Sequence, residues 1–151
     1  MPEKETLRRA RRDKRQGKAP STQAGEFIRE EMHHIREGKH GARSSRQAIA
    51  IGLSKARRAG VELTPPAKGT VAEKTRRSAQ RAYEVGHGAA PRRRSSARRS
   101  RATESALKRE PRAAASPRAL ARQARSAARR RGPARRSAAA RKAAQTRKGR
   151  R

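Results

Sequence analysis

The last 41 residues of the chain, 111–151, contain no aspartate or glutamate. Residues 67–151 hold 28 lysines and arginines against four acidic residues, a net charge of +24, whereas residues 1–66 hold 16 against eight, a net charge of +8. Like charges at this density oppose compaction, and a nearby polyanion relieves the repulsion. Residues 1–66 can therefore fold locally, while the remainder must stay solvated or bind an anion.

Large apolar side chains are scarce. Hydrophobic residues make up 31% of the chain, much of that is alanine, and the only aromatic rings besides histidine are Phe27 and Tyr83. So little apolar surface offsets only part of the chain entropy lost on folding. The composition predicts a mostly α fold class with extensive disorder, in which a small helical hairpin precedes an Arg/Ala-rich, low-complexity tail with latent helices.

Residues 21–63 are the segment most able to fold, as an amphipathic helical hairpin. Apolar residues at helical spacing predict a helix over 21–37, which Gly38 ends, and a second over 45–59, which Ser44 or Ser45 caps and Gly60 ends. Gly52 lies inside the second helix, where we expect a close approach between the helices to compensate for its poor helix propensity. The expected hairpin core is Phe27, Ile28, Met32, Ile35, Ile49 and Leu53.

A unit of about 40 residues without disulfides or metal is marginally stable alone. We therefore expect residues 21–63 to pair with a second copy as a homodimer, or to become ordered on a partner.

Two basic segments flank this hairpin in the sequence. Residues 1–20 form a basic arm in which residues 2–16 are predicted to be a helix with a cationic stripe. Within this helix only Leu7 and Ala10 are apolar, so packing is not expected to hold it. The stripe either binds phosphates or pairs locally with Glu3 and Glu5. Residues 64–90 predict a linker and a weak helix that begins with a capping box at Thr70.

The tail, residues 91–151, is expected to be disordered when free and helical when bound to an anion. Ser116 and Pro117 predict a helix start, and Gly132 with Pro133 predict a break. Between them, four arginines recur at i, i+4, i+7 and i+11 and share one helix face. These are Arg118, Arg122, Arg125 and Arg129.

The partner that fits this charge is nucleic acid. The arginine fork binds phosphate in a bidentate manner, and phosphate contacts alone provide no sequence information. We expect non-sequence-specific binding, with DNA coating or compaction favoured over an RNA- or ribosome-associated role. In a third interpretation, residues 21–63 are a protein–protein interaction module and the tail is a polybasic anchor. The expected contacts are Arg8, Arg11, Arg12, Arg15, Arg92, Arg93, Arg94, Arg98, Arg99, Arg118, Arg122, Arg125, Arg129, Arg130, Arg131, Arg135 and Arg136.

Catalytic and metal-binding patterns are weak. The chain has no cysteine, and it contains no phosphate-binding loop, zinc-protease or nucleophile-elbow motif. His33, His34 and His40 are expected to be surface histidines, although Glu30 and His34 have the i, i+4 spacing of two ligands on one helix face. We expect no enzyme activity, no cofactor, no metal, no small-molecule substrate, no secretory signal and no membrane segment.

Residues 23–60 resemble a family of short, basic bacterial proteins of unknown function. The resemblance rests on QAGEFIREEMHHIREGKH and, more specifically, on the QAIAIGLSKAR core within SSRQAIAIGLSKARRAG. Members of this family are loosely described as DNA-binding, which agrees with the charge of the chain. Together with the lack of a secretory signal, the charge leads us to expect a cytoplasmic, nucleoid-associated protein. The tail also resembles the alanine-rich basic tails of histone-H1-like proteins.

Overall fold

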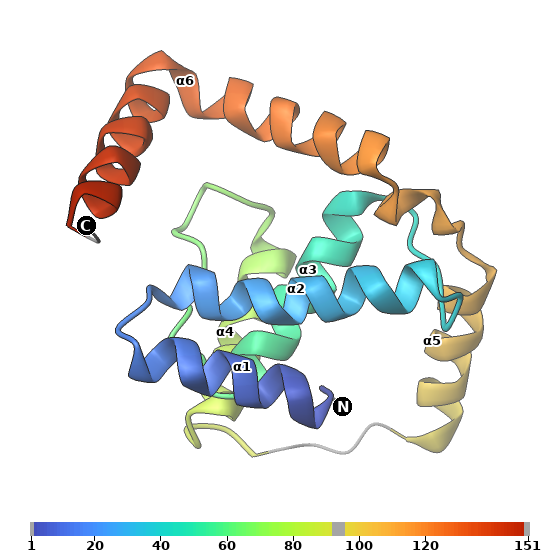
Figure 1. Ribbon diagram of the computed structural model, residues 1–151. Coiled ribbons are helices and arrows are strands. Elements are labelled where there is room, and N and C mark those ends of the chain that lie inside the picture. The colour runs from blue at the N-terminus through green and yellow to red at the C-terminus, as the bar shows by residue number, and fades with distance from the viewer. Residues whose placement is uncertain (1, 92–95, 150–151) are drawn as a thin grey trace. The chain divides into compact units, whose positions relative to one another are not determined.

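The computed structural model describes residues 2–91 and 96–149, and the helices below are those of this described part. The chain divides into two units, one up to Ala115 and one from Ser116 onward, and each is treated separately here. Figure 1 shows the order of the elements. They are α1 (Lys4–Arg15), α2 (Pro20–Arg36), α3 (Ser45–Arg58), α4 (Glu73–Gly86), α5 (Ala97–Arg109), the 3-10 helix η1 (Arg112–Ala115) and α6 (Pro117–Lys148).

The predicted hairpin is present as α2 and α3. The Ser44 hydroxyl accepts a hydrogen bond from the Gln47 amide at 3.2 Å and so caps α3 as expected. By contrast, α2 begins at Pro20, and its N-cap residue, Ala19, provides no side-chain hydrogen bond. Of the expected core residues, Phe27, Met32 and Ile35 are buried, whereas Ile28, Ile49 and Leu53 are half-buried.

Gly52 lies at a close approach between the two helices of the hairpin. A Cβ at this position would lie 2.8 Å from the Cα of Ile28 and 3.0 Å from its amide nitrogen. Backbone atoms at that distance leave no space for a methyl group, so the prediction of a close approach at Gly52 is confirmed.

Helix α1 packs against α2, which corrects the expectation that it has nothing to bury. Ala10 joins the buried cluster with Phe27, Ala56 and Val61, and Leu7 packs against that cluster. Thr6 and Asp13 are buried on the same face. Because these side chains are small or paired, the helix can approach closely without a wide apolar stripe.

Helix α4 packs against α3 through the small side chains of Ala79 and Ala82, both buried. The capping box expected at Thr70 is absent, because α4 begins at Glu73 and the Thr70 hydroxyl donates to the Ala67 carbonyl at 2.7 Å. Because α1 and α4 pack against the hairpin, the hairpin is part of a larger folded unit. Its small size alone therefore does not require a homodimer for stability.

The segment that follows α5 was predicted to be part of the tail, yet it is attached to the rest of the first unit. The amide of Gly41 donates to the Leu107 carbonyl at 2.8 Å, and the hydroxyl of Ser45 donates to the Ala114 carbonyl at 2.5 Å. Ala114 and Ala115 are buried. The boundary between the units therefore falls after Ala115 and not at residue 91.

Helix α6 forms the second unit, and the structure does not support the extensive disorder expected for the tail. The Ser116 hydroxyl accepts from the Ala119 amide at 3.2 Å, and Pro117 occupies the first turn, both as predicted. Gly132, with φ 72° and ψ 165°, interrupts the helix just before Pro133, and Figure 1 shows the sharp bend. Alanine, which lies between the arginines, has the highest intrinsic helix propensity. This propensity favours the helix more than expected against the repulsion between the arginines.

Candidate nucleic-acid interface

The second unit is purely cationic. Residues 116–151 contain 14 lysines and arginines and no acidic residue. The predicted arginine stripe lies on the first segment of α6, where its four members are within about 60° of one another at 100° per residue. All four side chains are exposed. Each guanidinium group of this row can contact a phosphate in a bidentate manner.

The other expected contacts on α6 are also exposed but form no single stripe. Arg130 donates to the Ser126 hydroxyl at 3.0 Å. Arg131 lies on another side of the same turn, and Arg135 and Arg136 follow the bend at Gly132. These four residues add positive charge around the helix rather than a second ordered row.

In the first unit, the cationic stripe of α1 faces outward. Arg8, Arg11, Arg12 and Arg15 are exposed, because the opposite side of the helix packs on α2. Arg8 forms an ion pair with Glu5, which is the local pairing weighed from the sequence. Within the described residues, Arg11, Arg12 and Arg15 have no acidic partner. This stripe is thus available to an anion, although it lies in a different unit from α6.

The remaining expected contacts lie near the start of α5. Arg98 and Arg99 are in its first turn and are exposed, whereas Arg92, Arg93 and Arg94 lie outside the described residues.

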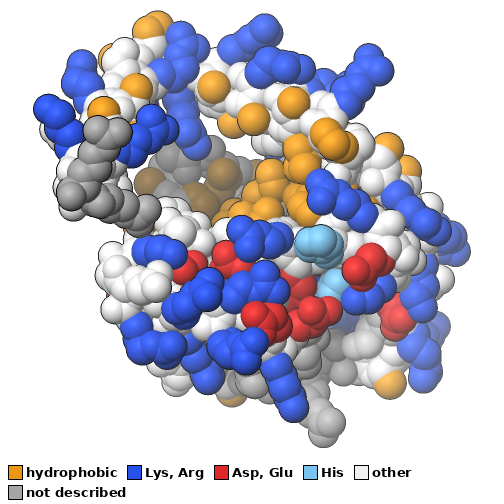
Figure 2. Space-filling view, viewed as in Figure 1, with side chains coloured by type: hydrophobic (Ala, Val, Ile, Leu, Met, Phe, Trp, Pro, Cys, Tyr) orange, Lys and Arg blue, Asp and Glu red, His pale blue; other side chains and the backbone are white. Residues whose placement is uncertain are grey.

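All 12 acidic residues lie in the first unit. Figure 2 shows many of them gathered over α1 and α2, with histidines beside them, while none lies along α6 at the top of the view. A groove of about 190 Å³ between α1 and α2 is lined by carboxylates that include Glu3, Glu26 and Glu37. Arg9, Arg29 and two histidines line the same groove, so its charge is mixed, unlike that of α6, and it is not part of the candidate interface.

The exposed carboxylates of the first unit are already paired with cationic side chains. A hydrogen bond from His34, followed by one from Lys39, lowers the pKa of Glu3. In the same way, the hydrogen bond from Lys14 lowers the pKa of Glu62, and that from Arg76 lowers the pKa of Glu73. The carboxylates thus neutralise nearby lysines and arginines of the first unit and leave those of α6 unpaired.

Two adjacent carboxylates, Glu30 and Glu31, are buried in the hairpin. Adjacent residues of a helix point in different directions, yet one ammonium group reaches both carboxylates. The Nζ of Lys55 lies 3.3 Å from Oε1 of Glu30 and 2.7 Å from Oε2 of Glu31. Burial raises the pKa of Glu30, but hydrogen bonds from Thr6 and from the amide of Glu3, with the charge of Lys55, outweigh burial and lower it.

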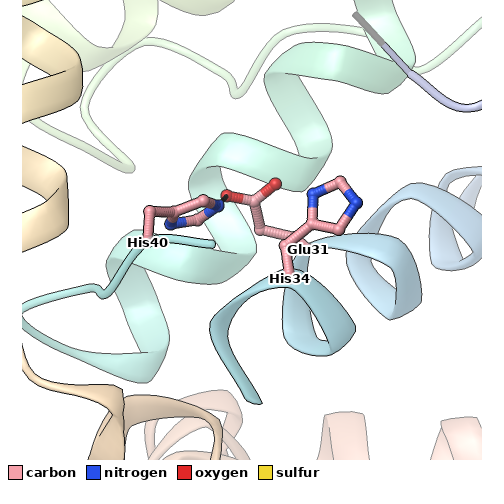
Figure 3. Close-up of side chains that lie close together, drawn as sticks. All are labelled: Glu31, His34 and His40. Carbon is pink, nitrogen blue, oxygen red and sulfur yellow. Dashed lines mark ion pairs between the residues drawn. The ribbon is translucent and has the colours of Figure 1, made fainter. Parts of the chain in front are cut away.

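Glu31 also meets two histidines. One ligand atom each from Glu31, His34 and His40 lie within 4.8 Å of one another, and Figure 3 shows the two rings on either side of the carboxylate. The pair suggested by sequence spacing was Glu30 with His34, and Glu31 was not among the candidate ligands. The signal for Glu31 was its i, i+3 spacing from His34 on α2, whereas the return of the chain after Gly38, which brings His40 close, leaves no periodic pattern. His33, the third histidine of the group, is exposed.

Comparison with protein-family models, with curated proteins and with solved structures finds no match to this chain. Among residues 2–91 and 96–149, no helix combines the length and the apolar character needed to cross a membrane.

Proposed function

We propose that this protein binds the phosphate backbone of nucleic acid without sequence preference, and that duplex DNA is its principal ligand. The observation on which the proposal depends is α6, an exposed helix with a single-sided row of four arginines in a unit of 14 basic residues and no acid. DNA coating or compaction in a nucleoid is the role that such binding would serve.

Duplex is preferred over single strands because base stacking needs aromatic platforms. The chain has one phenylalanine, one tyrosine and no tryptophan, and Phe27 is completely buried. Proteins that hold single strands combine a basic groove with exposed aromatic rings. A bare arginine row instead favours a regular phosphate backbone, which DNA and duplex RNA both offer.

The electrostatic mechanism makes a quantitative expectation possible. Each phosphate neutralised on a DNA duplex contributes about −0.9 to the slope of log K against log salt. If α6 neutralises about eight phosphates, the affinity falls on the order of 10⁴-fold between 50 and 200 mM salt.

The test compares two variants that lose the same charge. One replaces the four stripe arginines by glutamine (R118Q, R122Q, R125Q and R129Q), and the matched control replaces four basic residues beyond the bend (R141Q, K142Q, R147Q and K148Q). Binding to a fluorescent 20-base-pair DNA duplex, and to RNA of the same sequence, is measured by anisotropy across a salt series. We expect the stripe variant to lose about 3.6 from the slope, since four contacts are removed, and the control to lose less. Equal and small losses of slope in both variants would contradict the role of the stripe. Tighter binding to the RNA than to the DNA duplex would identify RNA, not DNA, as the ligand.

A further inference from the structure

We propose that Glu31, His34 and His40 bind one divalent transition-metal ion of the zinc type. Their ligand atoms lie within 4.8 Å of one another. In a tetrahedral site with bonds of about 2.0–2.1 Å, neighbouring ligand atoms are roughly 3.4 Å apart, so closure requires only small side-chain rotations. Two imidazoles and one carboxylate are ligands that zinc and its neighbours accept, with a position left for water.

The hydrogen bonds of His40 fix which of its nitrogens is free. Its Nδ1 lies 3.0 Å from the carbonyl oxygen of Gly41, and a carbonyl can only accept, so Nδ1 carries the proton. The other ring nitrogen, Nε2, lies 3.2 Å from Oε1 of Glu31, so these two atoms can ligate one ion held between them. An imidazole whose other nitrogen donates to a backbone carbonyl is how proteins commonly orient a metal ligand.

His34 is oriented in a similar way by a carboxylate. Its Nε2 lies 2.8 Å from Oε1 of Glu3, a carboxylate oxygen that can only accept, so Nε2 donates this hydrogen bond and Nδ1 remains for a metal ion. Figure 3 shows a ring nitrogen of His34 turned toward Glu31, and this nitrogen is Nδ1 because Nε2 is bonded to Glu3. The chain from carboxylate to histidine to metal is a recurring arrangement in zinc sites.

The Glu31 carboxylate is 1% exposed, and its Oε2 accepts no hydrogen bond within the described residues. Lys55 Nζ stands 2.7 Å from this oxygen as an ion pair, but without hydrogen-bond geometry. Lys55 therefore neutralises Oε2 and shares its charge with Glu30, which leaves Oε1 for the metal.

The local charge also favours a cation, unlike the rest of the molecule. Around the cluster, the ammonium groups of Lys39 and Lys55 pair with four carboxylates, those of Glu3, Glu30, Glu31 and Glu37. These six groups sum to −2 in a chain whose net charge is +32. A divalent ion balances this excess and links α1, through Glu3, to the end of α2 and to the loop that holds His40.

The test uses the full chain, freed of nucleic acid by nuclease and high salt and of metal by a chelator, with Zn²⁺ and Co²⁺ as probes. Isothermal titration is expected to show one ion per chain, and Co²⁺ is expected to give the visible absorption bands of a low-symmetry site. The variants are H34A and H40A, and the matched control is H33A, because His33 is on the same helix but exposed. Circular dichroism verifies that each variant is folded before titration.

We expect H34A and H40A each to weaken Zn²⁺ binding by tenfold or more and H33A to change it by less than twofold. E3Q, which removes the carboxylate behind His34, is expected to weaken binding by about tenfold, as outer partners of zinc histidines do. Zn²⁺ in hundredfold excess over its Kd is expected to raise the Tm of the wild-type chain by roughly 10 °C. Absence of saturable one-to-one binding overturns the proposal, and so does equal binding by H34A, H40A and H33A.

Discussion

Replacing Gly52 by alanine tests how tightly α2 and α3 pack. Alanine is the better helix former by about 1 kcal/mol, so local propensity alone predicts that G52A stabilises the protein. The structure predicts the opposite, because the new Cβ would lie 2.8 Å from the Cα of Ile28 and 3.0 Å from both its amide nitrogen and its Cγ1.

The size of the effect follows from what can move. A flexible side-chain tip could rotate away, but two of the three atoms contacted belong to the Ile28 backbone, so the helices themselves must separate. Overpacking of this kind costs about 1–3 kcal/mol. Relief of contact by helix separation also loosens the buried cluster around Phe27, which places the cost in the upper part of that range. After subtraction of the propensity gain, we expect G52A to lower the free energy of unfolding by about 1–2 kcal/mol.

The matched control is G25A, in α2. A Cβ at Gly25 meets no atom within 4 Å, so only the propensity gain remains and we expect stabilisation of up to about 1 kcal/mol. Urea unfolding of both variants, followed by far-ultraviolet circular dichroism at constant salt, measures the two changes. If G52A proved as stabilising as G25A, the close contact between α2 and α3 would be refuted.

Two further substitutions test buried polar groups. E30Q is expected to lower the free energy of unfolding by about 1–3 kcal/mol at pH 7. Because the pKa of Glu30 is lowered in the folded state, its contribution is complete above the unfolded pKa of about 4.3 and is lost as the pH falls through the folded pKa. The stability difference between wild type and E30Q should therefore shrink in urea titrations from pH 5 to pH 3, and a constant difference would contradict this assignment. R57M is expected to cost about 1–3 kcal/mol, because the buried Arg57 donates from Nε to the Leu63 carbonyl at 3.0 Å. Exposed Arg58 provides the control, and if R58M cost as much in urea unfolding, the interaction of Arg57 would have no special role.

The hairpin was predictable because its signals are local. The apolar spacing of Phe27 to Ile35 on α2 and the Ser44 cap of α3 each involve residues within one or two turns of each other. Gly52 was informative for the same reason, since a glycine inside a helix is costly unless something packs against it.

The docking of α1 was not predictable from periodicity. Its buried face combines Ala10 with the polar side chains of Thr6 and Asp13, and a hydrophobic pattern counts only the first. The carboxylate of Asp13 pairs with the ammonium group of Lys18 at 2.7 Å. At the start of α1, the amide of Glu3 donates to the carboxylate of Glu30, in α2, at 3.0 Å. The second of these contacts joins residues 27 positions apart, so it leaves no period in the sequence.

The segment before α6 was misassigned for a related reason. Its attachment to the first unit uses backbone groups, such as the carbonyls of Leu107 and Pro111 that accept from Gly41 and Ala42. Backbone hydrogen bonds leave no signature in side-chain pattern. The arginine stripe of α6, by contrast, could be read from spacing alone, because every member lies on one helix.

The most direct test of the phosphate-binding account is to compare the full chain with a chain that ends at Ala115, the boundary of the first unit. Affinity for a DNA duplex is measured by fluorescence anisotropy between 50 and 200 mM salt. The account predicts that removal of residues 116–151 makes the slope of log K against log salt shallower by about 7, the contribution of about eight phosphate contacts, and weakens binding at every salt concentration. A shortened chain that binds duplex DNA as tightly as the full chain, with the same salt slope, would contradict the account.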